Sequence, residues 1–337
     1  MLIVKRLFYV FISVSLLFSC TNEEPKQFKL TGNALGTTYH ITYIGEELAH
    51  FENKVDSMIA VINHSLSTYD EHSFISAFNA TRNKMEDSLY KSRFGKADLY
   101  LFDKMVRMST QISEKTDGAF DPSAALLFQE YSRAKSEGVV MNDSVVKHSL
   151  LHQGMSYIQW DENNYPLKTD SLVQLNFNAI AKGYLVDIIA DFISANGLSR
   201  YMVEIGGEMR LGGLNFEDSP WRVGINTPLL AAKSQDFFEV LELKNKAIAT
   251  SGNYQNYYMV NDSLVGHTLN PSLGIPVIHN LKSVSIIHEQ CAVADAMATA
   301  CMVVGLERAR EFISADTSLQ AYFIYEEDER LIGELME

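Results

Sequence analysis

The order of the apolar segments is the feature that most restricts how this chain can fold. From residue 28 onward, segments with apolar residues on one helical face alternate irregularly with short runs of β-branched and aromatic residues. Strands in blocks with long helices between them favour an α+β fold over a doubly wound parallel sheet. No linker rich in Pro, Gly or Ser divides the chain, so we expect a single body with two lobes.

The elements of this body can be placed approximately. Helices are expected near residues 51–66, 96–114, 181–195 and 292–304. Strands are expected near residues 39–44, 173–177, 201–205 and 284–287, with short β runs across 221–260 and a last strand at 319–325. Gly197 and Gly305 are expected to end the helices that precede them. Gly206 and Gly207 end a strand, where they could admit a ligand near the backbone, although a β-bulge explains them equally well.

The N-terminus has the layout of a secretory signal. Lys5 and Arg6 precede an apolar stretch that is too short to cross a bilayer, which needs about 20 residues. The stretch ends in Leu17-Phe18-Ser19-Cys20, which resembles a bacterial lipobox. We therefore expect a signal peptide at 1–19, a lipid anchor on Cys20 and a polar tether over 20–27. An ordinary signal peptide beside an accidental cysteine is the alternative.

The remaining cysteines and the charge exclude some classes of protein. Cys291 and Cys301 are ten residues apart, and in one helix they would lie about 15 Å from each other, beyond disulfide reach. We expect two buried, reduced thiols. The formal charge is −14, and a strongly acidic chain repels phosphate polyanions, so nucleic acid is not an expected partner.

Common nucleotide and metal signatures are missing from the sequence, which has no Gly-x-Gly-x-x-Gly fingerprint, Walker A loop or zinc spacing. The sharpest polar pattern is in the alanine-rich run from Cys291 to Cys301. Asp295 and Thr299 are four residues apart, so a helix places both oxygen donors on one face, as a hard cation requires. By itself, this run also fits a packing helix made of small residues.

Three further segments carry polar residues at the ends of apolar runs. Lys182 follows a junction between strand and helix, where unpaired backbone groups and a cation can meet an anion, but a solvated lysine fits as well. Residues 117–123 contain a turn followed by Pro122. His267 is a candidate general base, although a lone histidine is more often structural.

Together, these segments resemble the flavin transferase (ApbE) family in identity and order across nearly the whole mature chain. The resemblance rests on Ala34-Leu35-Gly36-Thr37-Thr38-Tyr39, Leu66-Ser-Thr68-Tyr69-Asp70, Thr116-Asp-Gly-Ala-Phe-Asp-Pro122, Ala179-Ile-Ala-Lys-Gly-Tyr184, Glu204-Ile-Gly-Gly207, Ala249-Thr-Ser-Gly252, Gly266-His-Thr-Leu-Asn-Pro271 and Ala294-Asp-Ala-Met-Ala-Thr-Ala300. It implies an ApbE-like (T-fold-like) body with mixed, mainly antiparallel sheets and flanking helices over residues 28–337.

The resemblance also implies a site. Asp295, Thr299 and the carbonyl of Ala179 would bind Mg²⁺, with His267, Lys182 and Asp295 as the catalytic groups. FAD would contact Leu35, Tyr69, Ala119, Phe120, Asp121, Asn176, Lys182 and Leu269. The sequence departs from the family's pattern at two places: the family more often has Asp at the position of Asn176, and Asp-Pro-Arg where this chain has Asn270-Pro271-Ser272.

The activity implied is Mg²⁺-dependent transfer of FMN from FAD to a Thr or Ser hydroxyl of an exported protein, such as a subunit of an Rnf-type or Nqr-type redox pump. The chain would act as a lipoprotein of a bacterial cell envelope. Two alternatives stay open: an FAD pyrophosphatase that releases FMN and AMP, and a flavin-binding lipoprotein without catalysis. The candidate base and metal pair argue against the second alternative.

Overall fold

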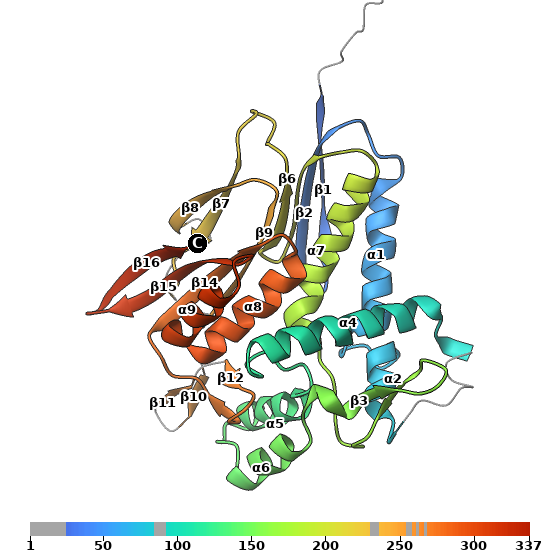
Figure 1. Ribbon diagram of the computed structural model, residues 1–337, viewed down its shortest axis with the longest axis vertical. Coiled ribbons are helices and arrows are strands. Elements are labelled where there is room, and N and C mark those ends of the chain that lie inside the picture. Colours follow the sequence, from blue (N-terminus) through green and yellow to red (C-terminus); the bar gives the residue numbers. More distant parts are fainter. Residues whose placement is uncertain (1–24, 84–91, 230–235, 254–257, 261–262, 266–267) are drawn as a thin grey trace, which may run out of the picture.

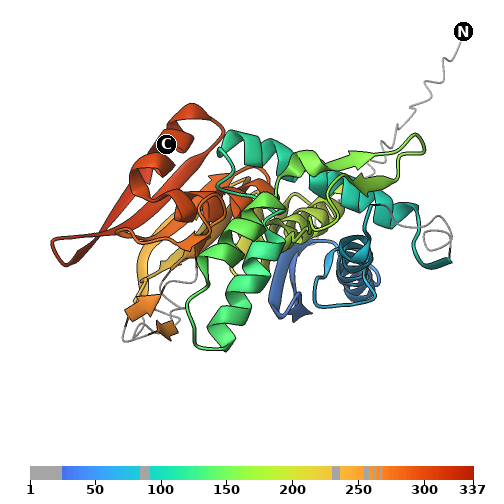
Figure 2. The same ribbon diagram turned by 90° about the horizontal axis from the view of Figure 1, so that it is seen from below.

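An eight-stranded antiparallel sheet forms the centre of the structure (Figure 1). The structure is a computed structural model that describes residues 25–83, 92–229, 236–253, 258–260, 263–265 and 268–337. In spatial order the strands are β1 (Lys26–Ala34), β2 (Thr37–Gly45), β5 (Arg200–Ile205), β6 (Glu208–Gly212), β9 (Lys246–Gly252), β14 (Leu281–His288), β15 (Gln320–Glu327) and β16 (Arg330–Met336). The edge strands β1 and β16 lie on opposite sides of the molecule (Figure 2).

Helices pack against one face of this sheet and against one another. They are α1 (Phe51–Leu66), α2 (Phe74–Ala80), α4 (Lys96–Lys115), α5 (Ala125–Ser136), α6 (Asp143–Leu151), α7 (Asn178–Ala195), α8 (Cys291–Val304) and α9 (Leu306–Ala315). The helices α7 and α8 lie side by side over the sheet and contact each other extensively (Figure 1). Both are apolar around most of their circumference, which is typical of helices buried in a core. The main hydrophobic core lies between these helices and the sheet.

A two-stranded sheet covers the other face. It consists of β7 (Trp221–Asn226) and β8 (Phe237–Leu243), and a second apolar cluster fills the space between it and the central sheet. Trp221 anchors the hairpin, because its indole N–H donates to the carbonyl of Gly212 at 2.9 Å. The remaining short elements are β3 (Ile158–Trp160), β4 (Pro166–Lys168), β10 (Tyr258–Val260), β11 (Ser263–Val265), β12 (Leu269–Asn270), β13 (Ile275–Pro276) and the 3-10 turn Met155–Tyr157.

The α+β class with antiparallel sheets is confirmed, and so are the helices expected near 51–66, 96–114 and 292–304. The strand expected at 173–177 is wrong: only Gln174 makes an isolated bridge, to Ala124. This segment is extended, but side chains hold it instead of a neighbouring strand. The amide of Asn79 exchanges two hydrogen bonds with the backbone of Leu175, both at 2.8 Å.

Two element boundaries also differ from expectation. The helix expected at 181–195 begins at Asn178, because the side-chain oxygen of Asn176 accepts the Asn178 N–H at 2.9 Å and starts the first turn early. The strand expected at 319–325 forms as β15, but it is not the last strand, since β16 follows after a tight turn. β1 begins at Lys26, two residues before the start expected for the folded body at residue 28.

In the described part of the chain, no helix is long and apolar enough to cross a membrane. Residues 1–19 and Cys20, which carry the predicted signal and anchor, lie outside the described residues. Cys291 and Cys301 are both buried and free, so the prediction of two reduced thiols is confirmed.

Candidate active site

A cleft of about 900 Å³ opens where the ends of several elements meet. Its walls come from the β5–β6 turn, β7, β9, the start of α7, the second half of α8 and α5. The predicted site residues that line it are Tyr69, Ala119, Phe120, Asp121, Asn176, Ala179, Lys182, Leu269 and Thr299. Side chains predicted from distant parts of the sequence therefore meet in one cavity.

The helices α7 and α8 approach unusually closely beneath this cleft, at Gly183. A Cβ at this position would lie 2.4 Å from the carbonyl oxygen of Cys291, so only glycine permits the contact. The Gly183 N–H donates to Asp295 Oδ2 at 3.1 Å, and Asp295 is 5% exposed. The close approach thus ties the candidate metal carboxylate on α8 to the backbone of α7.

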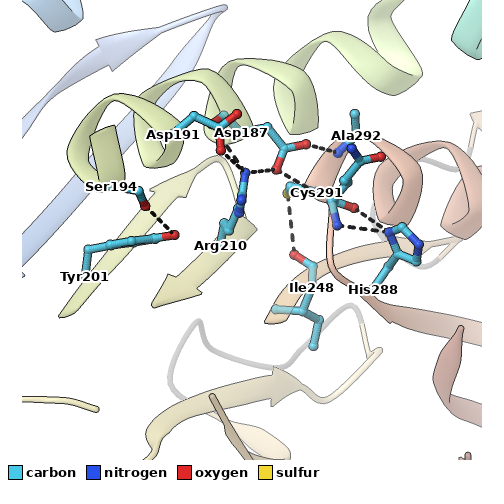
Figure 3. Close-up of polar contacts among 10 residues, drawn as sticks. Asp187, Asp191, Ser194, Tyr201, Arg210, Ile248, His288, Cys291 and Ala292 are labelled. Carbon is cyan, nitrogen blue, oxygen red and sulfur yellow. Dashed lines mark hydrogen bonds and ion pairs between the residues drawn. The ribbon is translucent and has the colours of Figure 1, made fainter. Parts of the chain in front are cut away.

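A second contact between the two helices lies one turn further along α7 (Figure 3). The carboxylate of Asp187 accepts the first two N–H groups of α8, from Cys291 and Ala292, both at 2.9 Å. These N–H groups have no partner inside their own helix, so Asp187 caps α8 from the neighbouring helix. Arg210 on β6 binds Asp187 at 3.0 Å and the more exposed Asp191 at 2.8 Å. The N-terminus of α8 is thereby fixed to both α7 and the sheet.

Lys182 and Glu208 form an ion pair in the wall of the cleft. Burial, together with the negative charge of Asp295, raises the pKa of Glu208. Burial also raises the pKa of Asp295, although Lys182 and the Gly183 N–H oppose this effect. Burial alone would lower the pKa of Lys182, but the charges of Asp295 and Glu208 outweigh it and raise that pKa. The ammonium of Lys182 thus pairs with Glu208 and also feels the charge of Asp295.

These residues fit a hard divalent cation. Asp295 supplies a carboxylate and Thr299 a hydroxyl one helical turn away, while Ala179 lies in the first turn of α7, across the cleft. Oxygen donors of this kind suit Mg²⁺ or Ca²⁺. The negative charge of the Asp295 carboxylate also favours a cation. The described residues contain no cluster of three or more His, Cys, Asp or Glu side chains, so a site here would combine carboxylate, hydroxyl and carbonyl oxygens.

The remaining predicted contacts differ in where they lie. The side chain of Tyr69 is highly exposed at the cleft, and its hydroxyl is 3.4 Å from the Asn178 amide. Leu35 is not among the residues that line the cleft. It forms the β1–β2 turn with φ of 50° and packs partly against the main core. His267 lies outside the described residues, so its role stays a prediction.

Glu208 is the buried site residue that the sequence patterns did not identify. It follows Gly206-Gly207, whose positive φ angles make the tight turn between β5 and β6. The glycine pair drew attention to this turn, but nothing in the neighbouring sequence indicates a partner for the carboxylate that follows it. Its burial and its pairing with Lys182 depend on contacts over a long sequence separation.

The fold and cleft together define a class of α+β protein with a candidate oxygen-donor metal site on two facing helices. A family model for the ApbE family matches residues 35–323. The FAD:protein FMN transferase of Vibrio cholerae is 30% identical over 303 residues, which cover 88% of this chain and 86% of the relative. The Escherichia coli protein of the same name is 28% identical over 332 residues, with 94% and 91% covered.

Solved structures agree with the sequence comparison. The flavin transferase ApbE from Vibrio cholerae aligns with a TM-score of 0.78 at 29% identity, covering 93% of this chain and 98% of the other. The apo form of the Pseudomonas stutzeri flavinyl transferase ApbE also gives 0.78, at 28% identity, with 94% and 96% covered. The chain therefore belongs to the ApbE family.

Proposed function

We propose that this chain transfers FMN from FAD to a Thr or Ser hydroxyl of an exported acceptor protein, in a reaction that depends on Mg²⁺. The observation that carries the proposal is the contact between α7 and α8. It places Asp295 against the backbone of α7, with Lys182 and Thr299 lining the same cleft. The cleft, at about 900 Å³, is large enough for a dinucleotide. Relatives that match nearly the whole chain are named FAD:protein FMN transferases.

The residues have distinct roles in this proposal. Asp295, Thr299 and the Ala179 carbonyl would hold Mg²⁺, which would supply positive charge to neutralise the pyrophosphate. Lys182 adds a second positive charge near the phosphates. Tyr69, the 119–121 segment, Asn176 and Leu269 hold the flavin and adenine ends of FAD.

The transfer step is a displacement at phosphorus. The acceptor hydroxyl oxygen forms a bond to the FMN-side phosphorus, and the bond from that phosphorus to the bridging oxygen breaks. AMP leaves with the bridging oxygen, and His267 takes the proton from the hydroxyl. A general base typically contributes about 10²- to 10⁴-fold in rate.

Substitution of His267 tests this reaction. We expect His267→Ala to bind FAD within a few-fold of the wild type but to lose most flavin transfer, measured as fluorescence of the acceptor on a denaturing gel. Wild-type transfer should fall as the pH drops through the range in which histidine titrates, because only neutral imidazole accepts a proton. Unchanged transfer by the variant would remove His267 from the mechanism, and a parallel loss of FAD binding would make it a ligand contact. Release of FMN and AMP without labelled acceptor would favour the pyrophosphatase.

We also propose that the protein is exported and anchored to the cell envelope by lipid on Cys20, with acceptors of the Rnf-type or Nqr-type pump subunits. The basic residues, apolar stretch and cysteine at the N-terminus support the anchor. We expect Cys20→Ala to move the protein from the membrane to the soluble fraction with its flavin chemistry intact. Membrane association that persists in this variant would contradict the anchor.

A further inference from the structure

One oxygen in the cleft has no use in the mechanism described above. Glu208 is 4% exposed and lines the cleft, and its Oε1 is paired with Lys182. Its other oxygen, Oε2, is buried and has no hydrogen-bond partner among the described residues. A buried polar atom without a partner costs about 1–3 kcal/mol, and more when it is charged, so a ligand that supplies a donor would stabilise it.

In its ionised form, paired with the ammonium of Lys182, Glu208 restricts what that ligand group can be. Phosphate diester and pyrophosphate oxygens carry no proton near neutral pH, and a carboxylate repels them. A metal ion is also a poor partner, because the ammonium of Lys182 already pairs with this carboxylate. The group must be an uncharged or cationic hydrogen-bond donor.

The position of Glu208 restricts it further. Lys182 joins Glu208 to the α7–α8 contact, where the candidate phosphate and metal groups lie. In FAD, the groups on either side of the pyrophosphate are the ribityl chain and the ribose, both of which carry hydroxyls. The N–H groups of the flavin and adenine rings are further from the phosphates. The acceptor side chain also brings a hydroxyl to this point.

We propose that Glu208 Oε2 accepts a hydrogen bond from a hydroxyl next to the reacting phosphate, carried by a sugar chain of FAD or by the acceptor. This inference rests on the proposed function and adds a hydroxyl-binding group to it. Glu208 is then a selective contact that recognises the hydroxyl, while Lys182 holds its other oxygen in place.

Binding measurements with matched ligand pairs test the proposal without turnover. The pairs are riboflavin with lumiflavin, which lacks the ribityl hydroxyls, and AMP with 2′,3′-dideoxy-AMP. Each is titrated calorimetrically into the wild type, Glu208→Gln and Glu208→Asp, which keeps the charge but withdraws the oxygen. Glu334→Gln is the matched control, because Glu334 is also ion-paired, to Arg310, but outside the cleft.

If FAD carries the hydroxyl, both Glu208 variants should weaken binding of one hydroxylated ligand by about ten- to a hundredfold and leave its hydroxyl-free partner unchanged. If the acceptor carries it, all four affinities stay unchanged and KM for a Thr-containing acceptor rises by a similar factor. Equal losses for ligands with and without hydroxyls would overturn the proposal, because Glu208 would then act only through Lys182. A shifted Mg²⁺ requirement, or no effect in either arm, would also overturn it.

Failure of the proposed function gives a different result. Flavin transfer by the wild type is measured on the same preparation with FAD, Mg²⁺ and acceptor. Absent transfer together with a selective loss of hydroxyl binding would reject the transferase and keep the hydroxyl contact. Normal transfer without selective loss would reject only the role of Glu208.

Discussion

Ion pairs occur in two contrasting regions of this molecule. Around α7, the pairs Lys182–Glu208 and Asp187–Arg210 are largely buried, with 6% and 10% of the two carboxyl side chains exposed. Around α9, Arg308 and Arg310 pair mainly with exposed carboxylates, such as Glu307 at 83%. We refer to these regions as the α7 interface and the α9 surface.

The two regions have different energetic consequences. An exposed ion pair contributes about 0–1 kcal/mol, because water already solvates both charges. A buried pair costs desolvation when it forms, and removing one partner leaves a charge stranded at a cost of several kcal/mol. The buried ion pairs of the α7 interface therefore add little net stability to the folded protein. The interface does hold α7, α8 and β6 in the arrangement that brings Ala179 and Thr299 to one cleft, with Asp295 buried at the α7–α8 contact.

Asp187 should show the largest effect on folding. We expect Asp187→Ala to lower the free energy of unfolding by about 3 kcal/mol, because two N–H groups of α8 lose their acceptor and Arg210 loses its buried partner. Asp191→Ala is the matched control, since Asp191 binds the same arginine but is 67% exposed. It should cost less than about 1 kcal/mol. Urea unfolding measures both, and equal losses would remove the distinction between buried and exposed partners.

Gly183 gives a smaller effect with an informative sign. Alanine in a helix interior is normally about 1 kcal/mol more favourable than glycine. At Gly183 the added Cβ would meet the Cys291 carbonyl, so we expect Gly183→Ala to destabilise the protein by about 2 kcal/mol. At Gly95, the N-cap of α4, a Cβ would meet no atom closer than 4.0 Å, so Gly95→Ala should cost only the loss of a favourable N-cap residue, about 1 kcal/mol or less. A Gly183→Ala protein as stable as the wild type would show that α7 and α8 can separate freely.

The smallest effect should come from the α9 surface, at Asp316, which caps the end of α9. The hydrogen bond from Lys115 contributes most to lowering the pKa of Asp316, and the hydrogen bond from Ser318 contributes next. Together they lower this pKa to about 2. A carboxyl whose pKa is depressed by folding adds stability above its unfolded pKa, near 4, and loses it as the pH falls toward 2. We expect Asp316→Asn to cost up to about 1 kcal/mol at pH 6 and less at pH 3, by chemical denaturation. A cost that does not change with pH would show that the charge is not involved.

The local pattern of the sequence predicted much of the fold but not the contacts made at long range. The run from Cys291 to Cys301 correctly indicated a helix that presents Asp295 and Thr299 on one face, because that information lies within a few turns. Residues 173–177 alternate like a strand, with Val173, Leu175 and Phe177 buried. Their hydrogen-bond partners include the side chains of Asn79 and Lys168, which no local pattern can specify.

The site shows the same limit. The sequence motifs identified Lys182, Asn176 and the 119–121 segment as candidate site residues. The structure places all of them in one cleft. Glu208 and Asp187 were missed, because a carboxylate in a strand or a helix has no visible partner until the fold brings Lys182 and Arg210 to it. Residues that would contact a ligand directly can be identified from sequence motifs. Residues that position other side chains can be identified only once the fold shows which groups they contact.

The most direct test of this account is the Mg²⁺ dependence of flavin transfer in Asp295→Asn. The substitution keeps the shape of the side chain but removes the charge that the proposed cation needs. Initial rates are measured over a range of Mg²⁺ concentrations with saturating FAD and acceptor, beside circular dichroism and unfolding curves for both proteins. The account predicts a folded variant whose rate is at least about a hundredfold lower at limiting Mg²⁺. A folded Asp295→Asn protein with the wild-type rate at limiting Mg²⁺ would contradict it.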